Sequence, residues 1–261
     1  MDWKKELYPE NEKPLDRLVE GYSNTSIFRT IGFIGDSLSS GEFEVRNEKG
    51  KFYHDLFEYS WGQHIARKNG LKAYNFSRGG MYAKLYMESF AESMGYFDKD
   101  KACQAYVIAL GVNDLLTFRM EPGSISDIDP EDYRNNKPTY LGYLAQVISK
   151  YKEISPDAKF FLVTFPDCET PGRKEEATLD NVKVMSELAE YFDNTYLLNM
   201  YEYGPKFNAE FQQKYYLHGH LNPMGYLLQA KLVDSYIDYI IRHNPDDFRN
   251  AGFIGTDIDY K

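Results

Sequence analysis

The stretch Ile31-Gly32-Phe33-Ile34-Gly35-Asp36-Ser37-Leu38-Ser39-Ser40-Gly41 joins a short apolar run to a turn that carries a serine. Four further apolar runs follow it along the chain, and they cover Ala73–Phe76, Ala105–Leu110, Lys159–Phe165 and Tyr196–Met200. Short, nearly continuous apolar runs bounded by Gly or Pro are typical of strands that are buried on both faces of a parallel sheet. The sequence therefore predicts five such strands.

Helical patterns separate these runs. We expect helices over 60–69, 82–95, 139–154 and 174–192, and a final helix that starts after Asn222 with Pro223 in its first turn. In that last helix an apolar residue recurs every four positions from Leu228 to Ile240, which gives it one apolar face. Strands that alternate with helices indicate βαβ units and a doubly wound α/β fold.

The chain divides into three predicted parts. Residues 1–26 are polar and are interpreted as an arm packed on the surface, 27–243 as the α/β domain, and 244–261 as a C-terminal tail. Two stretches, 41–59 and 117–138, do not fit the minimal alternation and are predicted to be loops on the same rim of the sheet. Long loops in this position are either walls of a site or surface decoration.

Composition excludes several classes of function. The net charge of −10 argues against binding to nucleic acid or to an anionic membrane surface. No segment has the roughly 18 apolar residues of a membrane span, and the N-terminus carries no apolar region of a signal peptide. Only Cys103 and Cys168 occur, so we expect a reducing, cytoplasmic location. The 16% aromatic residues either pack the core or line a site for flat ligands such as sugars.

Ser37 follows the first predicted strand directly, at the edge of the sheet where open α/β folds bind ligands. Its hydroxyl can be exposed at a strand-to-helix corner, with backbone N–H groups beside it for an oxyanion. A serine here can equally be a simple helix cap, and Gly-Asp-Ser-Leu alone is a weak signal.

Three further motifs follow. Asn75-Phe76-Ser77-Arg78-Gly79-Gly80 comes after the second run, and the N–H of Gly80 can donate to an oxyanion. Asn113, after the third run, can donate through its side-chain amide, and His220 lies in a predicted loop just before the final helix. Each alone has an ordinary structural explanation. Together they supply the nucleophile, oxyanion donors and base that acyl transfer needs.

These four motifs, in this order, resemble those of the SGNH, or GDSL-type, hydrolase family over residues 31–241. The resemblance implies a flavodoxin-like, three-layer α/β/α sandwich around a five-stranded parallel sheet. It also implies that Ser37 is the nucleophile and His220 the base, and that Gly80 and Asn113 join the Ser37 N–H in the oxyanion hole. No cofactor is implied.

One position departs from the family pattern. The family has Asp three residues before the histidine, and this chain has Leu217 there. A backbone carbonyl near Leu217 could hold the imidazole in a Ser–His dyad, or a carboxylate from elsewhere could take the place of the Asp. The third alternative is an impaired site, or a binding protein on the same scaffold.

Other charged residues near the motifs receive structural interpretations. Arg78 and Arg119 could pair with an anionic substrate, but salt bridges to acidic side chains are favoured. Residues Glu42, Glu44, Asp55 and Glu58 are interpreted as a solvated or structural face. His218 is interpreted as a packing or pocket residue, because His218 and His220 alone are too few ligands for a metal.

The expected function is hydrolysis of a small-molecule ester with a short, acetyl-like acyl group, on an alcohol such as a sugar. Alternatives are a thioesterase or lipase of the same family, a non-catalytic binding protein, and a nucleotide-binding flavodoxin-like module. The last would need a glycine-rich phosphate loop, which the chain lacks. No pattern in the sequence sets an oligomeric state.

Overall fold

The computed structural model describes residues 2, 7–169 and 175–259. Its central element is a parallel sheet of five strands in the order β4-β1-β5-β6-β7. The strands are β1 (Thr30–Gly35), β4 (Lys72–Ser77), β5 (Ala105–Ala109), β6 (Lys159–Val163) and β7 (Thr195–Leu198). All five predicted strands are confirmed, and the order is the flavodoxin-like arrangement.

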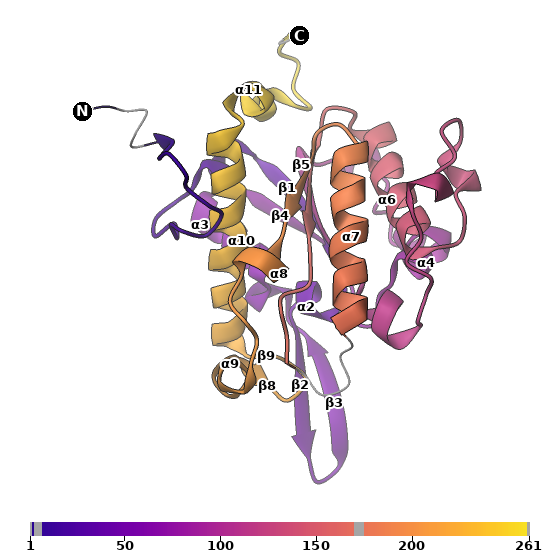
Figure 1. Ribbon diagram of the computed structural model, residues 1–261, viewed down its shortest axis with the longest axis vertical. Coiled ribbons are helices and arrows are strands. Elements are labelled where there is room, and N and C mark those ends of the chain that lie inside the picture. The colour runs from indigo at the N-terminus through magenta and orange to yellow at the C-terminus, as the bar shows by residue number, and fades with distance from the viewer. Residues whose placement is uncertain (1, 3–6, 170–174, 260–261) are drawn as a thin grey trace.

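Helices cover both faces of the sheet (Figure 1). On one face lie α3 (Trp61–Asn69) and α10 (Pro223–His243). On the other face lie α6 (Tyr140–Ile154), α7 (Glu175–Tyr191) and a third helical segment. That segment consists of α4 (Ala83–Leu85), a π-helical turn (Tyr86–Phe90) and α5 (Ala91–Ser93). The predicted helices are thus confirmed, except that residue 174 lies outside the described residues. The three-layer α/β/α sandwich is confirmed.

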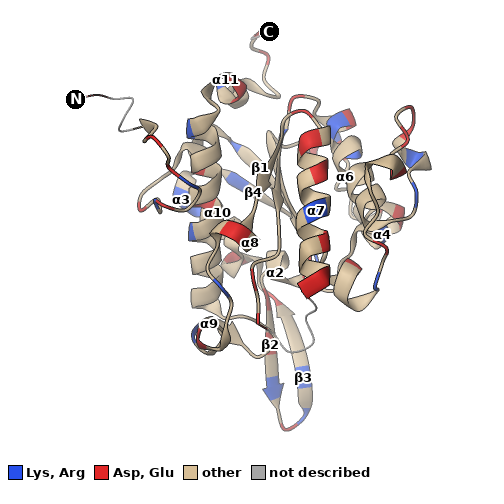
Figure 2. Ribbon diagram, in the orientation of Figure 1, with Lys and Arg blue, Asp and Glu red and all other residues tan. Residues whose placement is uncertain are grey.

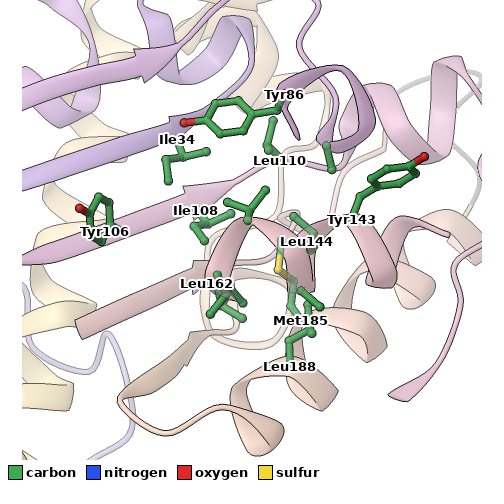
Figure 3. Packing of buried hydrophobic residues seen from close by; sticks show 14 of the residues in the cluster. Ile34, Tyr86, Tyr106, Ile108, Leu110, Tyr143, Leu144, Leu162, Met185 and Leu188 are labelled. Carbon is green, nitrogen blue, oxygen red and sulfur yellow. The ribbon is translucent and has the colours of Figure 1, made fainter. Parts of the chain in front are cut away.

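The alternation of side chains along β1 builds one core on each face. Ile34 lies in the cluster that α6 and α7 cover, with Ile108, Leu162 and Met185 (Figure 3). Phe33 points to the opposite face and meets Trp61 of α3 edge-on, with ring centroids 5.1 Å apart. Both faces of the sheet are therefore buried, which explains the continuous apolar runs in the sequence.

The prediction of a loop over 41–59 is wrong. This segment contains an antiparallel hairpin of β2 (Glu42–Asn47) and β3 (Gly50–Asp55), which extends beyond the carboxyl edge of the main sheet (Figure 1). Phe43 packs into the core, whereas Glu42 and Glu44 on either side of it lie against His220, because successive side chains of a strand point to opposite faces. Residues 117–138 form mainly irregular structure with two short 3-10 turns, as predicted for a loop.

The shorter elements gather around the carboxyl edge and the chain ends. They are α2 (Ser37–Ser40), α8 (Met200–Tyr203), α9 (Ala209–Tyr215), β8 (Tyr216–Leu217), β9 (His220–Leu221) and α11 (Pro245–Phe248). The N-terminal segment lies on α10, where Glu12 pairs with Arg242 at 2.8 Å and the Val19 N–H donates to Ser235 Oγ at 2.9 Å. The division into arm, domain and tail stays a prediction.

Charged residues of both signs occur along the hairpin and along α7 (Figure 2). Within the described ranges, every helix is too short or too polar to cross a bilayer.

Candidate functional site

Ser37 is the first residue of α2, immediately beyond the end of β1. Asp36 caps this helix, because its carboxylate accepts the Leu38 N–H at 3.0 Å. The helix ends after one turn at Gly41, whose φ of +81° is left-handed. Ser37 is half-buried, and a first-turn N–H has no partner within its own helix.

The segments that carry Gly80 and Asn113 are joined by two hydrogen bonds. The side-chain amide of Asn113 donates to the Met81 carbonyl at 3.0 Å, and the Asp114 carboxylate accepts the Ala83 N–H at 2.8 Å. Gly80 itself is exposed and has a φ of +70°. These bonds hold the turn after β4 and the turn after β5 together at one edge of the sheet. One N–H of the Asn113 amide remains for another acceptor.

Asp114 is fully buried, and its second carboxylate oxygen has no hydrogen-bond partner. Burial raises the pKa of Asp114 to about 7, and the nearby Asp36 charge adds to the shift, although the bond from Ala83 opposes it. The side chain therefore holds a proton readily near neutral pH.

His220 is the first residue of β9, where it pairs across a small antiparallel hairpin with Leu217. The prediction that His220 lies in a loop is wrong. A tight turn at His218, which has a φ of +59°, joins the two-residue strands β8 and β9. Helix α2 packs against β9, so Ser37 and His220 belong to neighbouring elements. Among the described residues, no hydrogen bond joins their side chains directly.

Tyr226, in the first turn of α10, connects the elements around Ser37. Its hydroxyl donates to the Glu42 carbonyl at 2.7 Å and lies 3.4 Å from the Ser37 carbonyl. Its ring is fully buried and meets Phe43 edge-on. The Gly-Tyr pair that follows His220 in the sequence thus fixes the start of the hairpin beside α2.

Two carboxylates of β2 contact the imidazole of His220, which the interpretation of Glu42 and Glu44 as part of a solvated or structural face did not foresee. Glu42 Oε1 lies 3.2 Å from Nε2, and Glu44 Oε2 lies 3.6 Å from Nδ1. Residues two apart on a strand share a face, so the hairpin presents both side chains to β9. The alternation of Glu42, Phe43, Glu44 and Val45 was the signal available in the sequence.

Burial and neighbouring charges shift the pKa values of Glu42 and His220. Burial raises the pKa of Glu42 to about 7, and the charges of Asp55, Asp36 and Glu44 add to that shift. Burial also lowers the pKa of His220, although the Glu44 charge opposes it. An imidazole with a lowered pKa is neutral at pH 7, the form that a general base requires.

The remaining sequence-predicted residues lie at the rim. Arg78 and Arg119 are exposed, and neither forms an ion pair within the described part of the chain, so the expectation of salt bridges is wrong. Arg78 instead lies over the ring of Phe90, 5.0 Å from its centroid. His218 is exposed, which does not fit a packing residue. The described residues hold no group of three His, Cys, Asp or Glu side chains suited to a metal.

A small cavity lies beside the Ser37 turn. Asp36, Leu38 and Ser39 line it together with side chains from the ends of β5 and β6, and most of the lining is apolar. Its volume is about 70 Å³.

The sequence of the chain matches a known family. The family model described as GDSL-like Lipase/Acylhydrolase matches residues 31–233, which run from β1 to the middle of α10. The chain belongs to this family. As a GDSL-like acylhydrolase it is a carboxylic ester hydrolase. No curated protein matches the chain.

Solved structures share the fold of this GDSL-like hydrolase at low sequence identity. A family two carbohydrate esterase from Clostridium thermocellum, solved with cellohexaose, is 18% identical with a TM-score of 0.58; the match covers 90% of this chain and 66% of that one. A carbohydrate acetylesterase from Sinorhizobium meliloti is 14% identical with a TM-score of 0.56, and the match covers 81% and 99%. A family two carbohydrate esterase from Corynascus is 16% identical with a TM-score of 0.56, and the match covers 82% and 66%.

Proposed function

We propose that this hydrolase removes short, acetyl-type acyl groups from a polar alcohol such as a carbohydrate, through an acyl-enzyme on Ser37. His220 takes the Ser37 proton as the hydroxyl attacks the acyl carbonyl. The N–H groups of Ser37 and Gly80 and the amide of Asn113 stabilise the oxyanion. His220 then protonates the leaving alcohol, and water releases the acid.

The observation that carries this proposal is the convergence of the four motif residues on one edge of the sheet. Ser37 follows β1, Gly80 follows β4, and Asn113 follows β5, which are adjacent parallel strands. The contact between α2 and β9 brings His220 to the same edge. Carboxyl ends of parallel strands meet there, so groups distant in sequence share one site.

The preference for a short acyl group has separate support. The cavity beside the Ser37 turn has about 70 Å³, roughly half the ~150 Å³ of an engineered cavity that admits benzene. Leu38 and Ser39 line this cavity but Ser37 does not, so the cavity bears on acyl length only if the acyl group enters it; an acetyl group then fits and a long alkyl chain does not. The preference for a sugar as the alcohol is supported by the three solved structures described above, all of which are carbohydrate esterases.

The direct test is hydrolysis of p-nitrophenyl acetate by the wild type, Ser37→Ala and His220→Ala, combined with labelling by a fluorophosphonate probe. We expect the probe to modify Ser37 in the wild type and both variants to lose nearly all turnover. Ser89→Ala, an exposed serine in the helical segment after β4, is the matched control for labelling. Normal turnover by Ser37→Ala would show that the proposed mechanism is wrong.

A further inference from the structure

The residue that the family pattern uses to orient the histidine is absent from this chain. Leu217 stands at that position, and in the structure it pairs with His220 across the β8–β9 hairpin. Its side chain is apolar and 38% exposed, so it offers the imidazole no hydrogen-bond acceptor. The ring nitrogen Nδ1 of His220 is buried and has no hydrogen-bond partner within the described chain.

Glu44 brings a carboxylate to that nitrogen from a different part of the chain. Its Oε2 atom lies 3.6 Å from Nδ1, and only 1% of its side chain is exposed. Gly219 makes this approach possible, because a Cβ at that position would lie 2.6 Å from the same oxygen. The distance is longer than a hydrogen bond, as is common at catalytic sites before substrate binds.

Two cations hold the Glu44 carboxylate in place. Arg46 Nε lies 2.6 Å from Oε1, and Lys51 Nζ lies 3.1 Å from Oε2. Burial by itself would raise the pKa of Glu44, but the hydrogen bonds from Arg46 and Lys51 lower it below its usual value. The group therefore stays ionised at neutral pH and has a fixed orientation.

The other carboxylates near His220 have different partners. Asp55 accepts the Ser40 hydroxyl at 2.5 Å, Asp36 caps α2, and Glu42 faces Nε2 rather than Nδ1. Tyr53 is paired with Glu44 in the hairpin, and its ring packs edge-on against the imidazole of His220, with ring centroids 5.7 Å apart.

We propose that Glu44 is the positioning residue of His220 and takes the place of the aspartate that this chain lacks at Leu217. This inference rests on the proposed function. Glu44 holds the proton on Nδ1, so that Nε2 carries the lone pair that accepts the proton of Ser37, and it stabilises the imidazolium that then forms. The inserted hairpin thus completes the site with a residue distant from His220 in sequence.

The first experiment compares Glu44→Gln with the wild type and with Glu48→Gln, an exposed residue of the same hairpin, on p-nitrophenyl acetate. Glu44→Gln should lower kcat by at least ~10-fold with little change in KM. For comparison, replacing the triad Asp of a serine protease with Asn lowers kcat by ~10⁴-fold. Glu48→Gln should behave as the wild type.

A second readout does not depend on turnover. The imidazole of His220 is titrated by NMR in the wild type and in Glu44→Gln, and a folded far-UV spectrum is required of both. Removal of the Glu44 charge should move the His220 midpoint to lower pH by ~1 unit. The other groups that face the ring, namely Glu42, Lys51, Tyr53 and Asp55, are present in both proteins.

The third experiment is a rescue. Adding Leu217→Asp to Glu44→Gln restores a carboxylate at the family position opposite His220, and it should recover a large part of the lost kcat. A purely structural role for Glu44 predicts no recovery.

The outcomes separate the two proposals. If Glu44→Gln keeps the wild-type kcat and the wild-type His220 midpoint while Ser37→Ala is inactive, the proposal for Glu44 is overturned and the proposed function stands. If Ser37→Ala remains active, the proposed function itself is wrong. If Glu44→Gln does not fold, Glu44→Asp takes its place, because its shorter stem moves the carboxylate away from Nδ1. A lower His220 midpoint and a lower kcat, with kcat recovered on adding Leu217→Asp, would then support the proposal. Wild-type kcat together with the wild-type midpoint would overturn it.

Discussion

The carboxylate of Glu42 lies 3.2 Å from Nε2 of His220, the nitrogen that must receive the proton of Ser37 under the proposed mechanism. The other carboxylate oxygen of Glu42 lies against Gly79, where a Cβ would be 2.0 Å away. Glu42 therefore fills the space between the histidine and the glycine turn in the resting structure.

This contact predicts a pH-dependent masking of the base. With its pKa near 7, Glu42 is ~90% protonated at pH 6, and its O–H can then donate to Nε2. We expect Glu42→Ala to raise kcat/KM at pH 6 by up to ~10-fold relative to the wild type, with a smaller difference at pH 8. The measurement is a pH profile of both proteins with Glu58→Ala, an exposed carboxylate of the same insertion, as control. A large loss of activity at every pH would contradict masking.

Asn113→Ala should remove one oxyanion donor. The expected result is a fall in kcat of ~10²–10³-fold with little change in KM, because the donor acts mainly on the transition state. The variant also loses the bond to the Met81 carbonyl, so the thermal unfolding midpoint is measured alongside. Asn135→Ala, in an exposed turn of the 117–138 segment, is the matched control. An unchanged kcat would remove Asn113 from the proposed site.

The cavity beside the Ser37 turn predicts selectivity for acyl length. On p-nitrophenyl esters, kcat/KM should be highest for acetate and fall by at least ~10-fold by octanoate, since each buried methylene needs room that about 70 Å³ does not supply. Higher activity on C8 to C12 esters than on acetate would overturn this assignment and favour a lipase.

Asp114 predicts a pH-dependent stability. Its pKa is about 7 in the folded protein against about 3.8 unfolded, so the stabilisation is fully present below pH 3.8 and is lost as the pH rises through 7. Asp114→Asn does not ionise. We expect the asparagine variant to gain stability relative to the wild type between pH 5 and pH 9, by about 3 kcal/mol at most. Urea unfolding at both pH values measures this, and a difference that does not vary with pH would contradict it.

The hydroxyls of Tyr86 and Tyr151 are 2.7 Å apart and both side chains are fully buried. Either single change to Phe leaves a buried hydroxyl without its partner and should cost ~1–3 kcal/mol. The double variant should cost less than the sum of the two single variants, because no unpaired hydroxyl remains. A double-variant cycle by urea unfolding measures the coupling, and additive effects would show that the pair is not coupled.

The sequence by itself determined the sheet and three of its turns. Each strand is buried on both faces, so its apolar run is continuous and can be recognised without knowledge of its neighbours. The same local logic locates Ser37, Gly80 and Asn113, because each directly follows a recognisable strand.

Only the tertiary structure decided what surrounds His220. The hairpin strand β3 is exposed along its whole length, so it leaves no apolar run, and the segment was predicted to be a loop. The contacts of Glu42 and Glu44 depend on the register of that hairpin and on its packing against β9, which are pairings between residues far apart in the chain. Local sequence does not encode such distances, and for that reason the missing aspartate at Leu217 was visible in the sequence while the carboxylate at Nδ1 was not.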